Sequence, residues 1–249
     1  GSKFALVCSS GTAALHLSLL AIGIKKNDII IMPSINFIAV YNLSISLGAK
    51  VILIDVDPLT GQMIPEKVLK SINSKNRNNI KAIVTMNLGG YPENIKKFFD
   101  IKKKFGFYLI EDACHALGTN FLYNNKLEKI GSCKYADIST FSLHPLKVIT
   151  AGEGGIISTN NGFFAKKIET LRSHGLKKDK KYYWKYTHED YGYNYRLSEI
   201  NCSLAISQLA RIDNFIKKRK KIAQYYVKNL TPFKDFITIP NYSNFNLSS

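Results

Sequence analysis

Short runs of aliphatic residues alternate along this chain with longer segments in which apolar residues recur every three or four positions. The aliphatic runs predict buried strands at residues 4–8, 29–33, 50–56, 81–87, 107–112, 138–141 and 155–159. The periodic segments predict helices at residues 12–22, 37–47, 65–73, 94–105 and 163–174. A polar hairpin is expected near residues 124–127. Because strands and helices alternate, we expect an α/β fold with a mostly parallel sheet and helices on both faces.

The pattern changes beyond residue 197. Residues 198–230 predict one long amphipathic helical stretch. We interpret this stretch as a bridge between two domains. The large domain is expected at residues 1–225, and residues 226–249 are expected to start a smaller one.

The chain is strongly basic, with 35 lysine and arginine residues against 18 aspartate and glutamate residues and a formal net charge of +17. Such an excess can mark a nucleic-acid-binding protein. Here the basic residues are mostly scattered lysines, densest at residues 177–181 and 217–221, and no aromatic–basic RNA motif accompanies them. We therefore interpret residues 217–221 as a solvated helix face and expect no nucleic-acid partner.

Four cysteines, Cys8, Cys114, Cys133 and Cys202, are far apart and form no CxxC pair. This spacing favours reduced, mostly buried thiols in a cytoplasmic protein over zinc or redox chemistry. No group of His, Cys or Asp residues has metal-ligand spacing. No run of 18 or more apolar residues occurs, so we predict no membrane span.

Lys147 lies in a weakly charged segment, FSLHPLKVITAGEGG at residues 141–155, between two apolar strand-like runs. A solvated loop lysine is one interpretation. The other is chemical, because an ammonium that is partly removed from water binds its proton less tightly and becomes a nucleophilic amine. Such lysines bond covalently to carbonyl groups, including the aldehyde of pyridoxal phosphate.

A carboxylate and a possible phosphate site accompany this lysine. Asp112 ends a predicted strand, and open α/β sheets bind ligands beyond the carboxyl ends of their strands. Its neighbour Glu111 is expected to point to the opposite face. Small residues and a Gly11–Thr12 step begin a predicted helix, where backbone N–H groups can hold a phosphate. Pyridoxal phosphate needs an acidic partner for its ring nitrogen and a lysine for its aldehyde, and both are present.

Six segments in this order, SSGTAAL, EDACHALG, SLHPLK, TAGEGG, RSHG and GYNYRLSEI, resemble the pyridoxal-phosphate-dependent sugar aminotransferases of the DegT/DnrJ/StrS type. The resemblance implies an aspartate aminotransferase-like large domain of fold type I with a seven-stranded-type sheet. Because members of the family are longer at both ends, it also implies that an N-terminal helical segment and most of the C-terminal small domain are missing. The RSHG and HPLK segments look most like enzymes that aminate C4 of a UDP-linked 4-keto-6-deoxy amino sugar in pseudaminic-acid-type pathways.

The resemblance implies a role for each matching residue. Lys147 would bond to the cofactor as the catalytic lysine, and Asp112 would keep the pyridine nitrogen protonated. The full cofactor-binding set would be Gly11, Thr12, Ala13, Phe37, Asp112, His115, Ser142, Lys147 and Asn194.

Within this set, the resemblance implies that Phe37 stacks on the pyridine ring and that His115 contacts the ring or its hydroxyl. The phosphate would be held by Gly11, Thr12, Ala13 and Ser142, and Asn194 would reach the phosphate of a partner subunit. Structural interpretations remain open. Asp112 can be a helix cap, Phe37 and His115 can be packed core residues, Ser142 can be a strand serine, and Asn194 can be a turn residue.

The resulting hypothesis is an enzyme that transfers an amino group from glutamate to a nucleotide-linked keto sugar for cell-surface glycan biosynthesis, acting as a homodimer with composite active sites. Two residues depart from the family pattern: Cys114 replaces an alanine and Ala151 replaces a threonine. One alternative is a pyridoxal-phosphate-binding regulatory protein of the same fold. A Rossmann-type oxidoreductase is disfavoured, because no GxGxxG follows the first strand.

Overall fold

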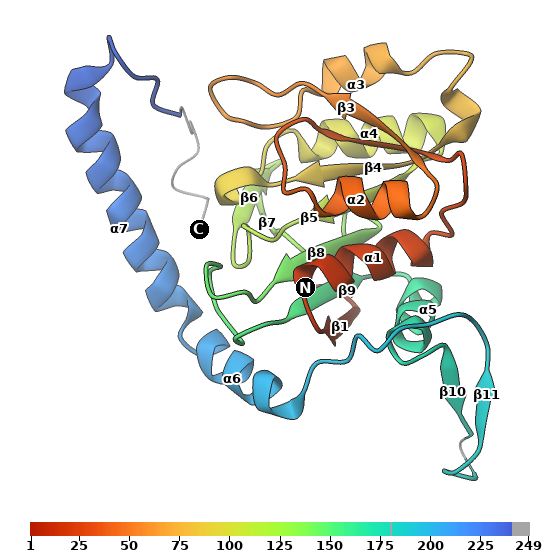
Figure 1. The fold of residues 1–249 in the computed structure, drawn as a ribbon. Helices are drawn as coiled ribbons and strands as arrows, with labels where there is room; N and C mark the ends of the chain where they lie inside the picture. The colour runs from red at the N-terminus through yellow and green to blue at the C-terminus, as the bar shows by residue number, and fades with distance from the viewer. Residues whose placement is uncertain (180, 241–249) are drawn as a thin grey trace.

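The computed structural model describes residues 1–179 and 181–240. Its centre is a seven-stranded sheet in the order β1-β9-β8-β5-β4-β2-β3 (Figure 1). The strands are β1 (Phe4–Cys8), β2 (Ile29–Pro33), β3 (Lys50–Ile54), β4 (Ile80–Met86), β5 (Tyr108–Asp112), β8 (Ile138–Ser142) and β9 (Gly155–Thr159). In this sheet β9 runs antiparallel to β1 and β8, while the other neighbouring pairs are parallel. The predicted α/β fold with a mostly parallel sheet is confirmed.

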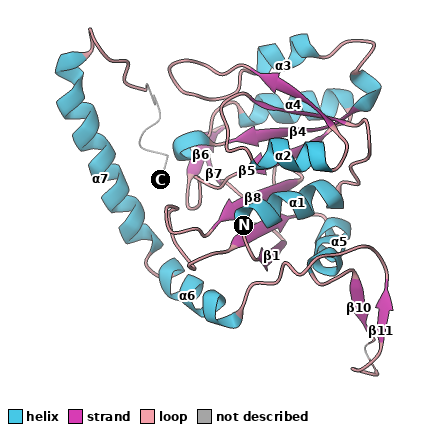
Figure 2. Ribbon diagram, in the orientation of Figure 1, coloured by secondary structure: helices cyan, strands magenta, loops and turns pink. Residues whose placement is uncertain are grey.

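Helices cover both faces of the sheet (Figure 2). They are α1 (Gly11–Ala21), α2 (Ala39–Ser46), α3 (Pro65–Ser71), α4 (Ile95–Phe105) and α5 (Gly162–Arg172). Residues of α1, α2 and α5 form one core cluster with strand residues such as Ile30 and Ile110. Residues of α3 and α4 form a second cluster with Ile31 and Leu109. Consecutive residues of one strand thus belong to opposite core layers, as the pleat of a buried strand requires.

This alternation decides the direction of two acidic side chains at the end of β5. Leu109 packs on the α3 and α4 side, and Ile110 packs on the α1 side. By the same period of two, Glu111 points toward the α4 side and Asp112 toward the α1 side. Glu111 also lines a cavity with Phe98 of α4, which supports this assignment. The predicted division of the two carboxylates is confirmed.

The prediction of one continuous helix over residues 198–230 was wrong. Two helices, α6 (Glu199–Leu209) and α7 (Ile212–Leu230), meet at a break where Arg211 has a non-helical φ of −112° and ψ of 8°. No glycine or proline marks the break. The physical reason is tertiary packing: Ala205 of α6 and Ile212 and Phe215 of α7 contact the same small apolar cluster. The break turns α7 away from the axis of α6 while residues of both helices keep their contact with that cluster (Figure 1).

Two small hairpins stand outside the main sheet. The first joins β6 (Asn120–Tyr123) to β7 (Lys126–Lys129) through Asn124 and Asn125, whose positive φ angles of 48° and 59° suit a two-residue hairpin turn. It confirms the predicted polar hairpin. The second pairs β10 (Leu176–Lys178) with β11 (Tyr186–His188), and the sequence pattern did not predict it.

The predicted domain boundary at residue 225 falls within α7, which continues to Leu230. The two-domain division stays a prediction, and residues 241–249 of the expected small domain lie outside the described residues. Among the described helices, none combines the length and apolar character needed to cross a membrane.

Candidate active site

Asp112 is a buried carboxyl at the carboxyl end of β5, with 2% of its surface exposed. Its Oδ1 accepts a hydrogen bond from the backbone N–H of Cys114 at 3.1 Å. Burial raises the pKa of the Asp112 carboxyl, while hydrogen bonding from Cys114 and the positive charge of Lys147 act in the opposite direction. The negative form of Asp112 therefore depends on nearby donors and on a cation. Lys147 supplies a positive charge within electrostatic range.

The first turn of α1 meets Ser142 at the end of β8. Gly11 begins α1, and a Cβ added there would lie 2.9 Å from Ser142 Cβ and 3.2 Å from Ser142 Oγ. The position therefore has room for glycine alone. Ser10 caps the helix by accepting from the Ala13 N–H at 3.0 Å. The helix N-terminus, the buried Ser142 hydroxyl and the exposed Thr12 form a small polar cradle.

Gly155, the last glycine of the GEGG segment, lets β9 approach this cradle. A Cβ at Gly155 would lie 2.1 Å from the Ser10 carbonyl oxygen, a distance that atoms do not tolerate. Cys114 also lies close to Gly11, since a Cβ at Gly11 would be 3.4 Å from its sulfur. Burial raises the pKa of the Cys114 thiol well above its ordinary value, so the thiol stays protonated. The replacement of alanine by Cys114 thus adds a neutral side chain to the wall of the cradle.

Lys147 lies in the connection between β8 and β9. At the base of this connection, Leu143 N–H donates to Gly154 O at 2.8 Å and Ala151 N–H donates to Leu143 O at 2.9 Å. At its tip, Lys147 N–H donates to His144 O at 2.9 Å. Leu146, next to Lys147, exposes 78% of its surface. Directly after Lys147, Val148 and Ile149 are buried, so the segment is packed beyond the lysine and exposed before it.

His115 lies three residues beyond Asp112 and near the lysine. Its Nδ1 accepts a hydrogen bond from the Gly89 N–H at 3.3 Å, which requires an unprotonated Nδ1. Burial, and then the positive charges of Lys147 and Arg219, lower the pKa of His115 from 6.5 to about 4. The imidazole is therefore neutral at physiological pH.

We predict that His115 makes the stability of the cofactor-free protein depend on pH. Between about pH 6.5 and pH 4 the unfolded chain binds a proton that the folded chain does not, so stability falls as the pH falls. Because His115 is only half-buried, solvent screening reduces the effect to about 1 kcal/mol between pH 7 and pH 5. Urea unfolding of the wild type and of His115→Gln at both pH values measures it. An equal loss of stability in the two proteins contradicts the prediction.

Lys147, Asp112, His115 and the polar cradle at the start of α1 thus lie in one region of the structure. Known proteins share the sequence features of this region. The family model described as the DegT/DnrJ/EryC1/StrS aminotransferase family matches residues 1–246. The chain belongs to this family. The predicted resemblance is confirmed.

Among the curated relatives of this aminotransferase-family chain is the UDP-4-amino-4,6-dideoxy-N-acetyl-beta-L-altrosamine transaminase of Campylobacter jejuni subsp. jejuni serotype O:23/36 (strain 81-176). It is 40% identical over 239 residues, which are 96% of this chain and 61% of the relative. The chain therefore spans about three-fifths of the length of such relatives.

Solved structures agree with the fold. Helicobacter pylori PseC, an aminotransferase involved in the biosynthesis of pseudoaminic acid, superposes with a TM-score of 0.82 at 31% identity, covering 92% of this chain and 59% of PseC. The structure of ntda from Bacillus subtilis with bound cofactor PMP superposes with a TM-score of 0.79 at 28% identity, covering 94% of this chain and 50% of that protein.

Two predicted cofactor residues of this aminotransferase-family chain lack a place in the site that the single chain forms. Phe37 precedes α2, which begins at Ala39, and exposes 71% of its surface. The alternative of a packed core phenylalanine is therefore wrong. Asn194 is exposed and pairs with Ser173 through an isolated antiparallel bridge. Within residues 1–179 and 181–240, no hydrogen bond joins Asn194 to Lys147 or Asp112, and both predicted roles remain predictions.

The RSHG segment has a structural role that sequence reasoning did not assign. Arg172 Nη1 donates to the Val7 carbonyl at 2.6 Å, which ties α5 to β1. His174 adopts a left-handed φ of 64° and its N–H donates to Tyr193 O at 2.9 Å. The segment therefore anchors the chain that carries Asn194 to the end of α5.

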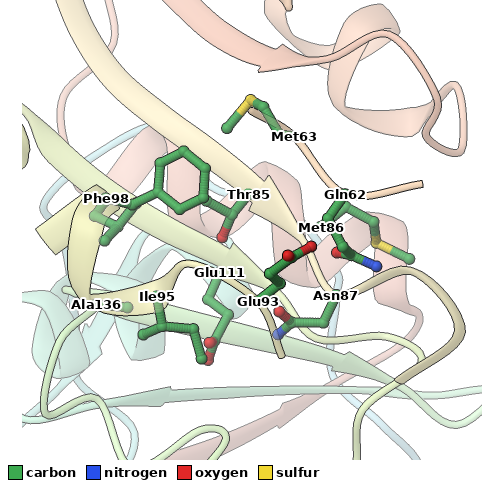
Figure 3. A pocket seen from close by; sticks show the side chains of 11 residues that line it. Gln62, Met63, Thr85, Met86, Asn87, Glu93, Ile95, Phe98, Glu111 and Ala136 are labelled. Carbon is green, nitrogen blue, oxygen red and sulfur yellow. The ribbon is translucent and has the colours of Figure 1, made fainter. Parts of the chain in front are cut away.

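Glu111 belongs to a separate buried polar cluster. Its Oε2 accepts from Ser139 Oγ at 2.7 Å and from Gly131 N–H at 3.2 Å. Figure 3 shows Glu111 in a small pocket together with Asn87, Glu93 and other side chains. Burial raises the pKa of Glu111. The pocket, with a volume of about 10 Å³, has room for about one water molecule and is too small for a substrate.

Proposed function

We propose that this chain carries the pyridoxal-phosphate-binding part of an aminotransferase that moves an amino group from glutamate to a nucleotide-linked keto sugar. The observation that supports it best is geometric: the buried Asp112 ends β5 beside β8, the strand that leads into the Lys147 segment, and Ser142 at the end of β8 meets the N-terminal turn of α1. Members of this aminotransferase family use pyridoxal phosphate, and the residues present fit that group.

The fit rests on charge and shape. Because Gly11 has no side chain, the first turn of α1 lies directly against Ser142, and a helix N-terminus attracts an anion such as a phosphate. The Asp112 carboxylate is buried and calls for a cationic partner, and a protonated pyridine nitrogen is one. Lys147 is half-buried, so its amine is not fully shielded from an approaching aldehyde.

When bound, pyridoxal phosphate supplies an aldehyde that bonds to amines and a ring that takes up electrons. Lys147 provides the amine that holds the cofactor and afterwards accepts and returns the proton at the substrate carbon as general base and acid. Asp112 holds a proton on the ring nitrogen through its negative charge. His115, neutral by its lowered pKa, orients the ring by hydrogen bonding without adding positive charge. Gly11, Thr12, Ala13 and Ser142 would bind the phosphate, and the Ala13 N–H, which donates to Ser10 Oγ in this structure, would exchange that partner for a phosphate oxygen.

For the acceptor, we propose C4 of a UDP-linked 4-keto-6-deoxy amino sugar. The name of the Campylobacter jejuni relative supports this substrate class, as does the pathway given for PseC. The formal charge of +17 favours the approach of an anionic nucleotide sugar by long-range attraction. A cytoplasmic location and a role in cell-surface glycan synthesis belong to the same proposal.

Turnover tests the function. The protein is incubated with pyridoxal phosphate, glutamate and candidate UDP-linked keto sugars, and the products are analysed by mass spectrometry. Formation of an amino sugar together with 2-oxoglutarate supports the enzyme. Cofactor binding without any amine transfer would instead favour the regulatory alternative.

We also propose that two copies of the chain form composite sites. The exposed Phe37 is followed by exposed apolar residues on and near α2, namely Ile38, Tyr41 and Ile45, which a second copy would cover. Asn194 is exposed on a firmly anchored segment, as a residue that serves a partner's site would be. In a two-fold dimer each subunit would then complete the other's phosphate site.

Mixing two inactive variants tests whether the sites are composite. Lys147→Ala and Asn194→Ala chains are expected to be inactive or weak alone, and to regain about one intact site per mixed dimer. The mixture should therefore recover about a quarter of wild-type activity at equal amounts of the two chains, since half of the dimers are mixed and each has one intact site. Mass in solution with and without pyridoxal phosphate gives an independent readout, because a ligand held by both chains favours the dimer. A monomer that binds the cofactor at full affinity contradicts the composite site.

A further inference from the structure

Two side chains from the C-terminal helices bind the backbone of the segment that carries Lys147. Arg219 of α7 donates through Nη2 to the Lys147 carbonyl at 2.7 Å and to the Leu146 carbonyl at 3.4 Å. Asn201 of α6 donates through Nδ2 to the Ala151 carbonyl. One donor thus lies at the lysine itself and the other lies four residues beyond it.

The packing of α7 explains why Arg219 reaches this place. Ile212 and Phe215 pack on the apolar cluster formed by the base of the Lys147 segment. Ile216 packs against Gly118, where an added Cβ would lie 2.5 Å from the Ile216 Cδ1 atom. Arg219 follows Phe215 by four residues and Ile216 by three, so it continues the same helix face. The helix face that packs α7 against the Lys147 segment therefore also carries Arg219, whose guanidinium contacts the Lys147 carbonyl.

The break between α6 and α7 allows both contacts. Asn201 lies in the first turn of α6, where Ser198 caps the helix by accepting from the Asn201 N–H at 3.2 Å. This cap places the Asn201 side chain at the start of α6, near Gly152, whose added Cβ would be 3.4 Å from Asn201 Nδ2. A straight helix would carry residue 219 about 27 Å away from residue 201 along one axis. Because the chain bends at Arg211, Arg219 of α7 and Asn201 of α6 both reach the segment that carries Lys147.

Only the side of the segment before Lys147 is exposed, since Val148 and Ile149 beyond the lysine are buried. Its base is held by backbone hydrogen bonds between Leu143, Ala151 and Gly154, but Leu146 at the tip is mostly exposed. The carbonyls of Leu146 and Lys147 both accept from one guanidinium. Both hydrogen bonds come from Nη2, and the planar guanidinium holds the direction of its hydrogens more rigidly than a lysine ammonium does.

We propose that Arg219 and Asn201 are positioning residues that fix the backbone on both sides of Lys147 and so hold its amine in the orientation the reaction needs. The inference rests on the proposed function insofar as Lys147 is the reactive lysine. Orientation matters because a small displacement of a reacting group lowers the rate strongly even when binding is unchanged. The helices leading toward the end of the chain would thereby control the geometry of the site.

Hydrogen exchange on the cofactor-free protein tests the contacts directly. In Arg219→Met, Asn201→Leu and the double variant, amide exchange in residues 143–154 is expected to accelerate, by about tenfold in the double variant. Exchange in α7 and in the central sheet should stay unchanged. Lys218→Ala, at an exposed neighbouring position of α7, is the matched control and should leave the segment as in the wild type.

Steady-state kinetics of the protein with bound pyridoxal phosphate give a second test. Arg219→Met should lower kcat by about tenfold with KM within about twofold of the wild type, and Arg219→Lys should recover part of the loss by keeping a cationic donor. Unchanged exchange in residues 143–154 overturns the inference. It is also overturned if exchange rises equally throughout α7, because the variants then act by unfolding the helix. The exchange result stands even if cofactor trapping shows that Lys147 is not the reactive lysine, so the two proposals fail separately.

Discussion

Replacement of Lys147 by alanine is expected to remove covalent attachment of pyridoxal phosphate and to lower amino transfer by about 10³- to 10⁴-fold. The methyl group of alanine can neither bond to the aldehyde nor carry a proton to and from the substrate carbon. The fold should persist, because Lys147 contributes its backbone, and not an apolar side chain, to the β8–β9 connection. Borohydride reduction followed by peptide mass spectrometry locates the attachment site in the wild type.

Two further variants separate charge from nucleophilicity. Lys147→Arg keeps a positive charge near Asp112 but stays protonated and cannot bond to an aldehyde, so it should be as inactive as the alanine variant. Lys75→Ala removes an exposed lysine from a surface loop and should leave attachment and turnover unchanged. A cofactor adduct that survives in Lys147→Ala would assign the reactive amine to another lysine.

Asp112→Asn is expected to leave pyridoxal phosphate bound while turnover falls by about 10²- to 10³-fold. The reason is electrostatic. Asp112 is buried and its negative charge can hold a proton on the ring nitrogen, whereas an amide of the same shape carries no charge. Without that proton the ring accepts electrons poorly, so the proton-transfer step at the substrate carbon slows while the phosphate cradle still binds. Cofactor titration and steady-state kinetics measure the two effects independently.

Glu111→Gln is the matched control for this prediction. Glu111 is the preceding residue, is also buried, and points to the opposite face, where it accepts from Ser139 and Gly131. Its amide can still accept those hydrogen bonds, so turnover should stay within a few-fold of the wild type. Near-normal turnover in Asp112→Asn would mean that Asp112 serves only to accept the Cys114 N–H as a local cap.

Local sequence determined the sheet, its layers and the core of the site. Strand and helix periods differ, so the alternation of the two was readable from apolar spacing alone. The period of two along β5 was enough to separate Glu111 from Asp112, because each strand side chain has only two faces to choose from. The order of cradle, aspartate and lysine was likewise local information, carried by short motifs that begin or end an element.

Only the tertiary structure decided the features that depend on distant partners. The break at Arg211 has no glycine or proline to announce it, and it falls between two helices that both pack on one cluster. Arg219 lies in a run of lysines that reads as a solvated face, and its role comes from the Lys147 carbonyl 72 residues earlier in the chain. The exposure of Phe37 likewise depends on tertiary structure, because no other segment of the described chain covers its side chain. Contacts between segments far apart in sequence leave no periodic trace in either segment, so apolar spacing and motifs could predict the elements and the chemistry but not the side chains that support the site.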